Sequence, residues 1–309
     1  MHYRAFNGFI APDYRSLVIA EQTFEGYRRE VVGFVRWVRT RGYVLTNIRL
    51  IDCYLEEYLH WLHPQRGKGA CSNVLSGVVH FFPEFKGRLY RASLTMRGIN
   101  RAQPGKQWTP IPWHLAVLVA FWQSRVYGLR YGIATLVGQH CLLRVSEIMN
   151  IRTTDVVERR DDRFGRNNTT MVIRLRKTKA GMVQSVSVDD HGVEELLMVL
   201  LRCTRPGERL FPFTSDKFRK TMHAATAALG IRHHFVPHGL RHGGATEHWM
   251  RWRDLGGLAL RGRWASERSV RRYVQEGEMM LVDQSIPDHI RRLAFWFARD
   301  VFLALTQRH

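Results

Sequence analysis

The sequence predicts a mainly α-helical protein with one small three-stranded antiparallel sheet, divided into two domains. First, 309 residues are more than one ordinary hydrophobic core holds. Second, apolar residues recur at helical spacing over most of the chain. Third, residues 151–188 are rich in β-branched side chains that nearly alternate with polar ones. A hydrophobic content of 45% and a charged content of 24% are those of a globular protein, which excludes wholesale disorder.

The first domain, residues 1–100, is expected to be a helical bundle. Val31, Phe34, Val35 and Val38 illustrate the helical spacing of its apolar residues. The expected helices run from residue 14 to about 41, from 47 to 62, from 71 to 82 and from 90 to 96, with breaks at Pro64, Gly67, Gly69 and Pro83. Turn residues with little periodicity then predict a linker over residues 101–112.

The second domain, residues 113–309, is expected to begin with two helices, within 113–126 and 131–143. The predicted strands are 151–157, 169–176 and 183–188. Residues 159–168 join the first two, and the turn 177–181 joins the last two. Helices follow over 191–203 and 215–229. A final helix is expected over 287–308, because Pro287 suits a first helical turn and an apolar side recurs after it.

Charge is the most informative bulk property. The chain holds 47 Lys and Arg against 27 Asp and Glu, which gives a net charge of +20 and a pI near 10.6. Such an excess favours a nucleic-acid partner, because each phosphate that the protein neutralises releases counterions. The alternatives are a protein that is basic without a polyanionic partner, and one that contacts an anionic membrane surface. The four cysteines are scattered, the histidines form no metal-ligand motif, and no signal peptide or membrane span is expected.

Four residues near the C-terminus have a distinctive joint spacing. His238 and Arg241 are three apart, Trp264 follows Arg241 by 23 residues, and Tyr273 follows Trp264 by nine. This order resembles the tyrosine recombinase (phage integrase) family, in which a His-x-x-Arg pair, a later His or Trp and a nucleophilic Tyr share one active site. Each residue type alone is common, but the joint spacing is not.

The resemblance extends upstream and supplies further candidates. Arg144 matches the family's first catalytic Arg in a Leu-Arg-x-Ser-Glu helix start, and Glu147 matches the acid that supports the site. Leu142 stands where many members carry Gly. The family's catalytic lysine lies in the turn between the second and third strands, which here holds Lys177 and Lys179; counting back from the third strand favours Lys179, while the Lys-Thr-Lys-x-Gly pattern resembles members that use the first lysine.

The chemistry explains why these residue types belong together. A tyrosine hydroxyl has an ordinary pKa of about 10 and is a weak nucleophile unaided. Arginines neutralise the charge that builds on the phosphate, and a lysine can protonate the leaving 5′ oxygen, so neither metal nor ATP nor another cofactor is needed. The Trp264 indole is a donor only and cannot shuttle protons. His242 and His248 are interpreted as structural.

The resemblance implies a two-domain tyrosine recombinase architecture, with a helical core-binding domain and an integrase-like catalytic domain clamped around double-stranded DNA. Tyr273 would cut one strand and form a 3′-phosphotyrosine. Dimers on each site would pair into tetramers, with the last helix a candidate for exchange between protomers. Contacts to backbone phosphates are expected from Arg28, Arg36, Arg271 and Arg272.

The GRWAS-x-x-SVRRYV pattern looks most like recombinases of eukaryotic mobile elements. The localisation would be nuclear in a eukaryotic host, and cytoplasmic, at the nucleoid, in a bacterial or phage one. A type IB topoisomerase, a domesticated non-cleaving DNA-binding protein and a basic RNA- or chromatin-binding module are the competing hypotheses. The complete set of family site residues counts against a protein that has lost its cleavage activity. No RNA-binding signature is present in the sequence.

Overall fold

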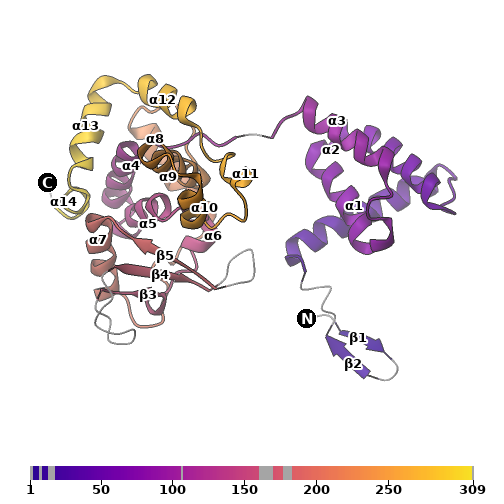
Figure 1. Ribbon diagram of the computed structural model, residues 1–309, viewed down its shortest axis with the longest axis horizontal. Coiled ribbons are helices and arrows are strands. Elements are labelled where there is room, and N and C mark those ends of the chain that lie inside the picture. The colour runs from indigo at the N-terminus through magenta and orange to yellow at the C-terminus, as the bar shows by residue number, and fades with distance from the viewer. Residues whose placement is uncertain are drawn as a thin grey trace. The chain divides into compact units, whose positions relative to one another are not determined.

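The computed structural model describes residues 3–6, 9–12, 18–105, 107–159, 170–176 and 183–307. The chain forms two compact units, Met1–Lys106 and Gln107–His309 (Figure 1). Both are mainly helical, and the second contains a three-stranded antiparallel sheet, so the predicted fold class is confirmed. Within the described ranges, no helix has the length and apolar character needed to cross a membrane.

The first unit is a helical bundle preceded by a hairpin. Strands β1 (Tyr3–Phe6) and β2 (Phe9–Pro12) pair antiparallel. This hairpin was not predicted, although Asn7-Gly8 between two short runs is a favoured hairpin signal. The helices are α1 (Glu21–Thr40), α2 (Ile48–Phe81) and α3 (Tyr90–Ala102), with a 3₁₀ turn at Pro83–Phe85. Their core includes Phe34, Trp37, Leu55, Tyr58, Leu59 and Val74.

Three helix boundaries in this unit differ from those expected. Helix α1 begins at Glu21, because Ala20 is still extended. Helix α2 continues through Pro64 and is interrupted at Gly67, whose φ of 73° and ψ of 178° are far from helical values. Glycine takes a positive φ at little steric cost, so the break falls there and not at the proline. Helix α3 extends six residues beyond its expected end at Met96.

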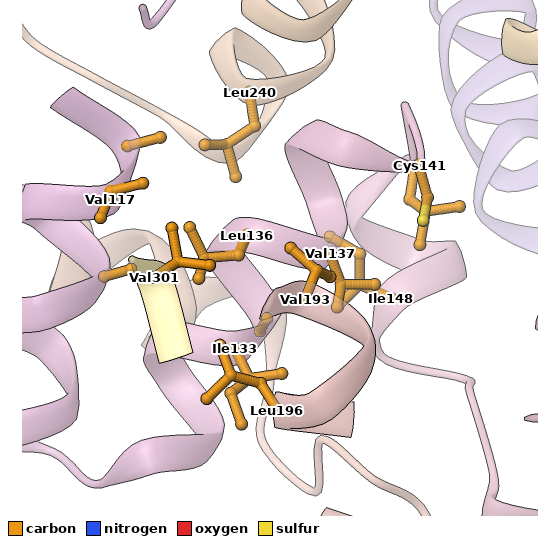
Figure 2. Packing of buried hydrophobic residues seen from close by; sticks show 14 of the residues in the cluster. Val117, Ile133, Leu136, Val137, Cys141, Ile148, Val193, Leu196, Leu240 and Val301 are labelled. Carbon is orange, nitrogen blue, oxygen red and sulfur yellow. The ribbon is translucent and has the colours of Figure 1, made fainter. Parts of the chain in front are cut away.

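The second unit is built on two buried helices, α4 (Trp113–Val126) and α5 (Leu129–His140). Around them lie α6 (Val145–Ile148), α7 (His191–Arg202), α8 (Ser215–Ala228), α9 (Pro237–Trp252), α10 (Leu255–Gly262) and α11 (Glu267–Val270). Figure 2 shows how Leu240 of α9, Val117 of α4 and Leu136 of α5 face one common core. That core fixes the position of α9, which carries the His-x-x-Arg pair.

The sheet has the predicted order and direction. Strands β3 (Val156–Val157), β4 (Met171–Leu175) and β5 (Gln184–Val188) lie antiparallel in chain order. Ile173 of β4 pairs with Val156 on one side and Val186 on the other, and all three are buried. The first strand is shorter than expected, because Thr153–Asp155 forms a 3₁₀ turn. The turn 177–181 lies outside the described residues.

The predicted final helix 287–308 is wrong as a single element. After α12 (Glu276–Ser285) the chain forms α13 (Asp288–Ala298) and α14 (Val301–Thr306). Asp300 interrupts the helix because its carboxylate accepts the Leu303 N–H at 2.9 Å and so caps a new one. Helix α13 packs on α4, with Phe297 stacked on Phe121 at 4.2 Å, and α14 packs on α7. Both helices therefore cover the core of their own unit.

Candidate active site

Tyr273 lies in a turn between α11 and α12, where aromatic and basic side chains surround its ring. The ring centroid is 4.7 Å from that of Trp264, 5.7 Å from that of His238 and 4.6 Å from that of His242. The guanidinium carbon of Arg241 lies 5.4 Å from the same centroid. The four residues identified by their spacing are thus brought together in one cluster.

Arg241 is the most deeply buried member, with a relative exposure of 0%. One terminal nitrogen donates to the Leu142 carbonyl and the other to the Gly262 carbonyl, the latter at 2.6 Å. Its guanidinium also stacks on Trp264, 4.3 Å from the ring centroid. Burial, followed by the charges of Arg144 and Arg263, lowers the pKa of Arg241 to about 10. The side chain remains cationic at neutral pH and is fixed in position.

Arg144 is held at the start of α6 by two hydrogen bonds that it donates to the Glu147 carboxylate. Glu147, buried at 3% exposure, accepts the Arg144 backbone N–H at 2.8 Å and its Nη1 at 2.6 Å. Leu142, two residues earlier, has a φ of 50°, which explains why glycine suits this position. Its side chain is nevertheless buried against Ala245, Leu258 and Val270. The departure from the family's Gly is tolerated, and the turn aims the Leu142 carbonyl at Arg241.

Arg263 is a site residue that the sequence reasoning missed. It ends α10 in the left-handed region, with φ 57°, and its side chain is 4% exposed. Its Nη2 donates to Glu147 Oε2 at 2.9 Å and to the Leu142 carbonyl at 3.2 Å. Burial raises the pKa of Glu147, but the Arg144 amide, Arg263 and the Arg144 guanidinium outweigh it, so this pKa lies below its ordinary value. The available signal was an Arg directly before Trp264.

Two of the three histidines on α9, His238 and His242, lie beside Tyr273 and are neutral at pH 7. Burial, followed by the charges of Arg241 and Arg144, lowers the pKa of His238. Burial and His238 lower the pKa of His242 to about 4, and its Nδ1 accepts from Gln275 Nε2 at 2.6 Å. His242 was interpreted as structural, and its contact with the Tyr273 ring places it in the cluster as well. His248 instead lines a separate pocket with His140 and Trp252.

The backbone of the tyrosine segment is held from the same helix. The Thr246 hydroxyl lies 3.2 Å from the Tyr273 carbonyl and accepts the Gln275 N–H at 3.0 Å. Since His242 and Thr246 are four residues apart, they lie on one face of α9. This face therefore contacts both the ring of Tyr273 and the chain that follows it.

Several buried donors of the cluster have no acceptor. Within the described part of the chain, Arg241 Nε, Arg263 Nε and Trp264 Nε1 are buried and make no hydrogen bond. Three guanidinium groups, those of Arg144, Arg241 and Arg263, are grouped here, and Glu147 forms ion pairs with two of them, Arg144 and Arg263. Buried donors and charge without a partner are unfavourable, so this arrangement suits an added anion.

The remaining candidates are placed as follows. Lys177 and Lys179 lie outside the described residues. Arg271 and Arg272 are exposed beside Tyr273. In the first unit Arg36 is exposed on α1, whereas Arg28 is paired with Glu25 at 3.0 Å. The described residues contain no group of three His, Cys, Asp or Glu side chains placed to hold a metal ion.

Comparison with known proteins decides the family. The model of the phage integrase family matches residues 115–279, more than half of the chain. The chain belongs to the phage integrase family. It is thus a tyrosine recombinase, a DNA strand transferase of a family that requires neither metal nor ATP. A search of curated protein sequences returns no match.

Solved structures support the same fold. A λ integrase dimer bound to a COC′ core site is 14% identical, with a TM-score of 0.55, covering 85% of this chain and 75% of that one. The Tn1549 transposon integrase with circular intermediate DNA is 12% identical, with a TM-score of 0.54 and coverages of 84% and 98%. XerH recombinase on a palindromic difH substrate is 15% identical, with a TM-score of 0.55 and coverages of 82% and 75%.

Proposed function

We propose that this protein is a site-specific DNA recombinase or integrase in which Tyr273 is the nucleophile. The observation that carries the assignment is the pair of buried, unpaired N–H donors, Arg241 Nε and Trp264 Nε1, beside the Tyr273 ring. A phosphodiester supplies the oxygen acceptors and the negative charge that this cluster lacks. Arginine is the side chain best suited to such an anion, because it remains charged and can bind two oxygens at once.

The reaction follows from these side chains. The Tyr273 oxygen attacks the scissile phosphorus, the phenol proton passes to a base, and the bond from phosphorus to the 5′ oxygen breaks as the new phosphotyrosine bond forms. His238 is the proposed base, because its lowered pKa keeps it neutral and able to accept that proton. Arg144 and Arg241 neutralise the non-bridging oxygens. Trp264 donates its indole N–H to the phosphate and packs the site.

Covalent trapping tests the nucleophile. A randomised library of duplexes, nicked a few nucleotides 3′ of each candidate cleavage position, loses its short 5′-hydroxyl fragment after cleavage and leaves DNA linked to the protein. We expect wild type to form denaturant-resistant adducts and Tyr273→Phe to form none, while its affinity for DNA changes by less than about 3-fold. A persistent adduct in Tyr273→Phe would refute the assignment. Sequencing the trapped DNA yields the target for later assays.

The general acid is proposed to be Lys179, with Lys177 as the alternative. A 5′-bridging phosphorothiolate replaces the leaving oxygen with sulfur, which departs without protonation. We expect Lys179→Ala to cleave ordinary DNA poorly and the phosphorothiolate at close to the wild-type rate, with Lys177→Ala little affected on either substrate. The reverse pattern would assign the role to Lys177, and an unrescued loss in both would refute a lysine acid in this turn.

The proposed substrate is double-stranded DNA bound by both units as domains, residues 1–100 and 113–309, with 101–112 as the linker. Arg28, Arg36, Arg271 and Arg272 are proposed to contact its backbone, so Ala substitutions should weaken binding and lower its salt dependence. A dimer per site and a tetramer on two sites are proposed, since a λ integrase neighbour is a tetramer on a Holliday junction. Relaxation of supercoiled plasmid without two-site recombination would instead favour a type IB topoisomerase activity.

A further inference from the structure

Arg263 stands at a backbone position where an arginine is unexpected. Its φ of 57° lies in the left-handed region, which glycine occupies without the steric clash that a Cβ causes. Its guanidinium is also withdrawn from water, and burial lowers its pKa despite the opposing effect of Glu147. Backbone strain and desolvation both disfavour arginine here, so the contacts of its side chain must account for its presence.

Those contacts reach the two groups that hold the other arginines of the site. Arg263 Nη2 bonds Glu147 Oε2 at 2.9 Å, and the same carboxylate bonds Arg144 through Oε1 at 2.6 Å. Nη2 also lies 3.2 Å from the Leu142 carbonyl, which accepts from Arg241 Nη1. The Arg263 guanidinium therefore bonds both Glu147, which holds Arg144, and the Leu142 carbonyl, which holds Arg241.

The backbone next to Arg263 adds a further connection. Its chain neighbours are Gly262, whose carbonyl accepts from Arg241 Nη2 at 2.6 Å, and Trp264, which stacks on Arg241. A Cβ on Gly262 would lie 1.6 Å from Trp264 Cζ3, so this turn is packed without spare room. A shift of Arg263 would consequently move Arg241 through both the Gly262 carbonyl and the Trp264 ring.

We infer that Arg263 is a positioning residue for strand cleavage, which holds Glu147 and the Leu142 carbonyl so that Arg144 and Arg241 meet the scissile phosphate together. This inference rests on the proposed function and adds a residue to it. Arg263 acts through these two arginines, because its side chain is enclosed by Glu147 and by the Cys141 and Leu142 carbonyls. Nothing in the role requires its own contact with DNA.

The first test is single-turnover cleavage of a nicked duplex that carries the target sequence identified from the covalently trapped DNA. We expect Arg263→Met to slow adduct formation by about 100-fold, the loss expected when reacting groups are misplaced by about 1 Å. Binding of the same duplex should change by less than about 3-fold, because the phosphate contacts elsewhere persist. Arg263→Lys keeps the charge but not the forked geometry and should lose about 10-fold. If both variants cleave like wild type, the inference is refuted.

The matched control is Arg261→Met, two residues earlier. Arg261 is a partly buried arginine at the end of the same helix, but it pairs with Asp189 and the His140 carbonyl, outside the cluster. We expect its removal to leave the cleavage rate unchanged. An equal loss in the Arg261 and Arg263 variants would show a general effect of α10 on folding, and would refute a specific role.

A DNA substrate with an uncharged phosphate distinguishes a positioning role of Arg263 from a general effect on the stability of the protein. In a methylphosphonate one non-bridging oxygen is replaced by a methyl group, so the phosphate has no charge for the arginines to neutralise. The penalty of Arg263→Met should fall from about 100-fold to below about 10-fold, in parallel with that of Arg144→Ala. On ordinary DNA, the double variant Arg144→Ala/Arg263→Met should lose less cleavage rate than the product of the two single losses, because both residues act through one network. An unchanged penalty, or losses that multiply, would overturn the inference.

These outcomes are distinct from failure of the proposed function. If wild type forms no adduct that Tyr273→Phe abolishes, the proposed function fails. If that adduct forms as expected and the Arg263 variants cleave normally, only the present inference fails.

Discussion

Replacing Glu147 by Gln tests whether this carboxylate holds the cationic cluster together in the absence of DNA. The residue is 3% exposed and accepts the Arg144 N–H, Arg144 Nη1 and Arg263 Nη2 at 2.6–2.9 Å. Glutamine keeps the shape but removes the charge, which leaves the guanidinium groups without a counter-ion. Removing one partner of a buried ion pair costs about 3–5 kcal/mol. Because Arg144 is partly exposed, at 29%, we take the lower end, about 3 kcal/mol.

The assay is thermal and urea unfolding of the DNA-free protein, followed by tryptophan fluorescence. A loss of about 3 kcal/mol corresponds to a decrease in Tm of about 6–12 °C for a unit of this size. The matched control is Glu194→Gln, in which a buried glutamate of the same unit pairs with one arginine of the described residues, the half-exposed Arg159, at 2.6 Å. We expect its loss to be below about 1 kcal/mol.

The pH dependence supplies an independent check on Glu147. Its folded pKa lies below the ordinary value of 4.5, so its stabilisation is fully present above pH 4.5 and is lost as the pH falls through the folded pKa. The difference in the free energy of unfolding between wild type and Glu147→Gln should therefore be constant near neutral pH and should disappear at acidic pH. A variant within about 1 kcal/mol of wild type at pH 7 would refute this account of the cluster.

Three further predictions follow from the site. Leu142→Gly should be more stable than Leu142→Ala by about 1 kcal/mol in urea unfolding, because φ is 50° there; the usual order, with alanine better, would refute the strain argument. Gly262→Ala should displace Trp264 and abolish measurable adduct formation, whereas Gly277→Ala, which meets open space, should cleave normally; equal rates would contradict the packing. His242 is neutral in the fold, with a pKa of about 4, so it removes about 2 kcal/mol of stability as the pH falls from 6.5 to 5; His242→Asn should flatten that decline, and an unchanged slope would count against it.

Much of the candidate site follows from local sequence spacing. His238 and Arg241 are three apart on a helix and so share a face, and the Leu-Arg-x-Ser-Glu pattern places Arg144 at a helix start. The sheet was also predictable, since Met171, Ile173 and Leu175 alternate with less buried residues. In each case the pattern that predicts the structure spans only a few residues and depends on the repeat of a single helix or strand.

The residues that were missed depend on contacts between distant segments. Arg263 meets Glu147, 116 residues earlier, and its position directly before Trp264 does not reveal that contact. His242 enters the cluster only because the Tyr273 turn folds back onto α9, where Gln275 bonds it. Asp300 splits the last helix through a single cap, which the apolar periodicity across it concealed. These features are properties of the packed chain.

The covering of Arg241 has a consequence for selectivity in solution. Its guanidinium has no exposed surface, and the rings of Trp264 and Tyr273 lie against it. A free phosphate ion or nucleotide makes too few contacts elsewhere to separate those rings, whereas duplex DNA adds contacts along its whole backbone. We therefore expect the rings of Trp264 and of Tyr273, the proposed nucleophile, to act as a size filter. Small anions should be poor inhibitors, because only a long polyanion gains enough binding free energy to uncover the charge beneath them.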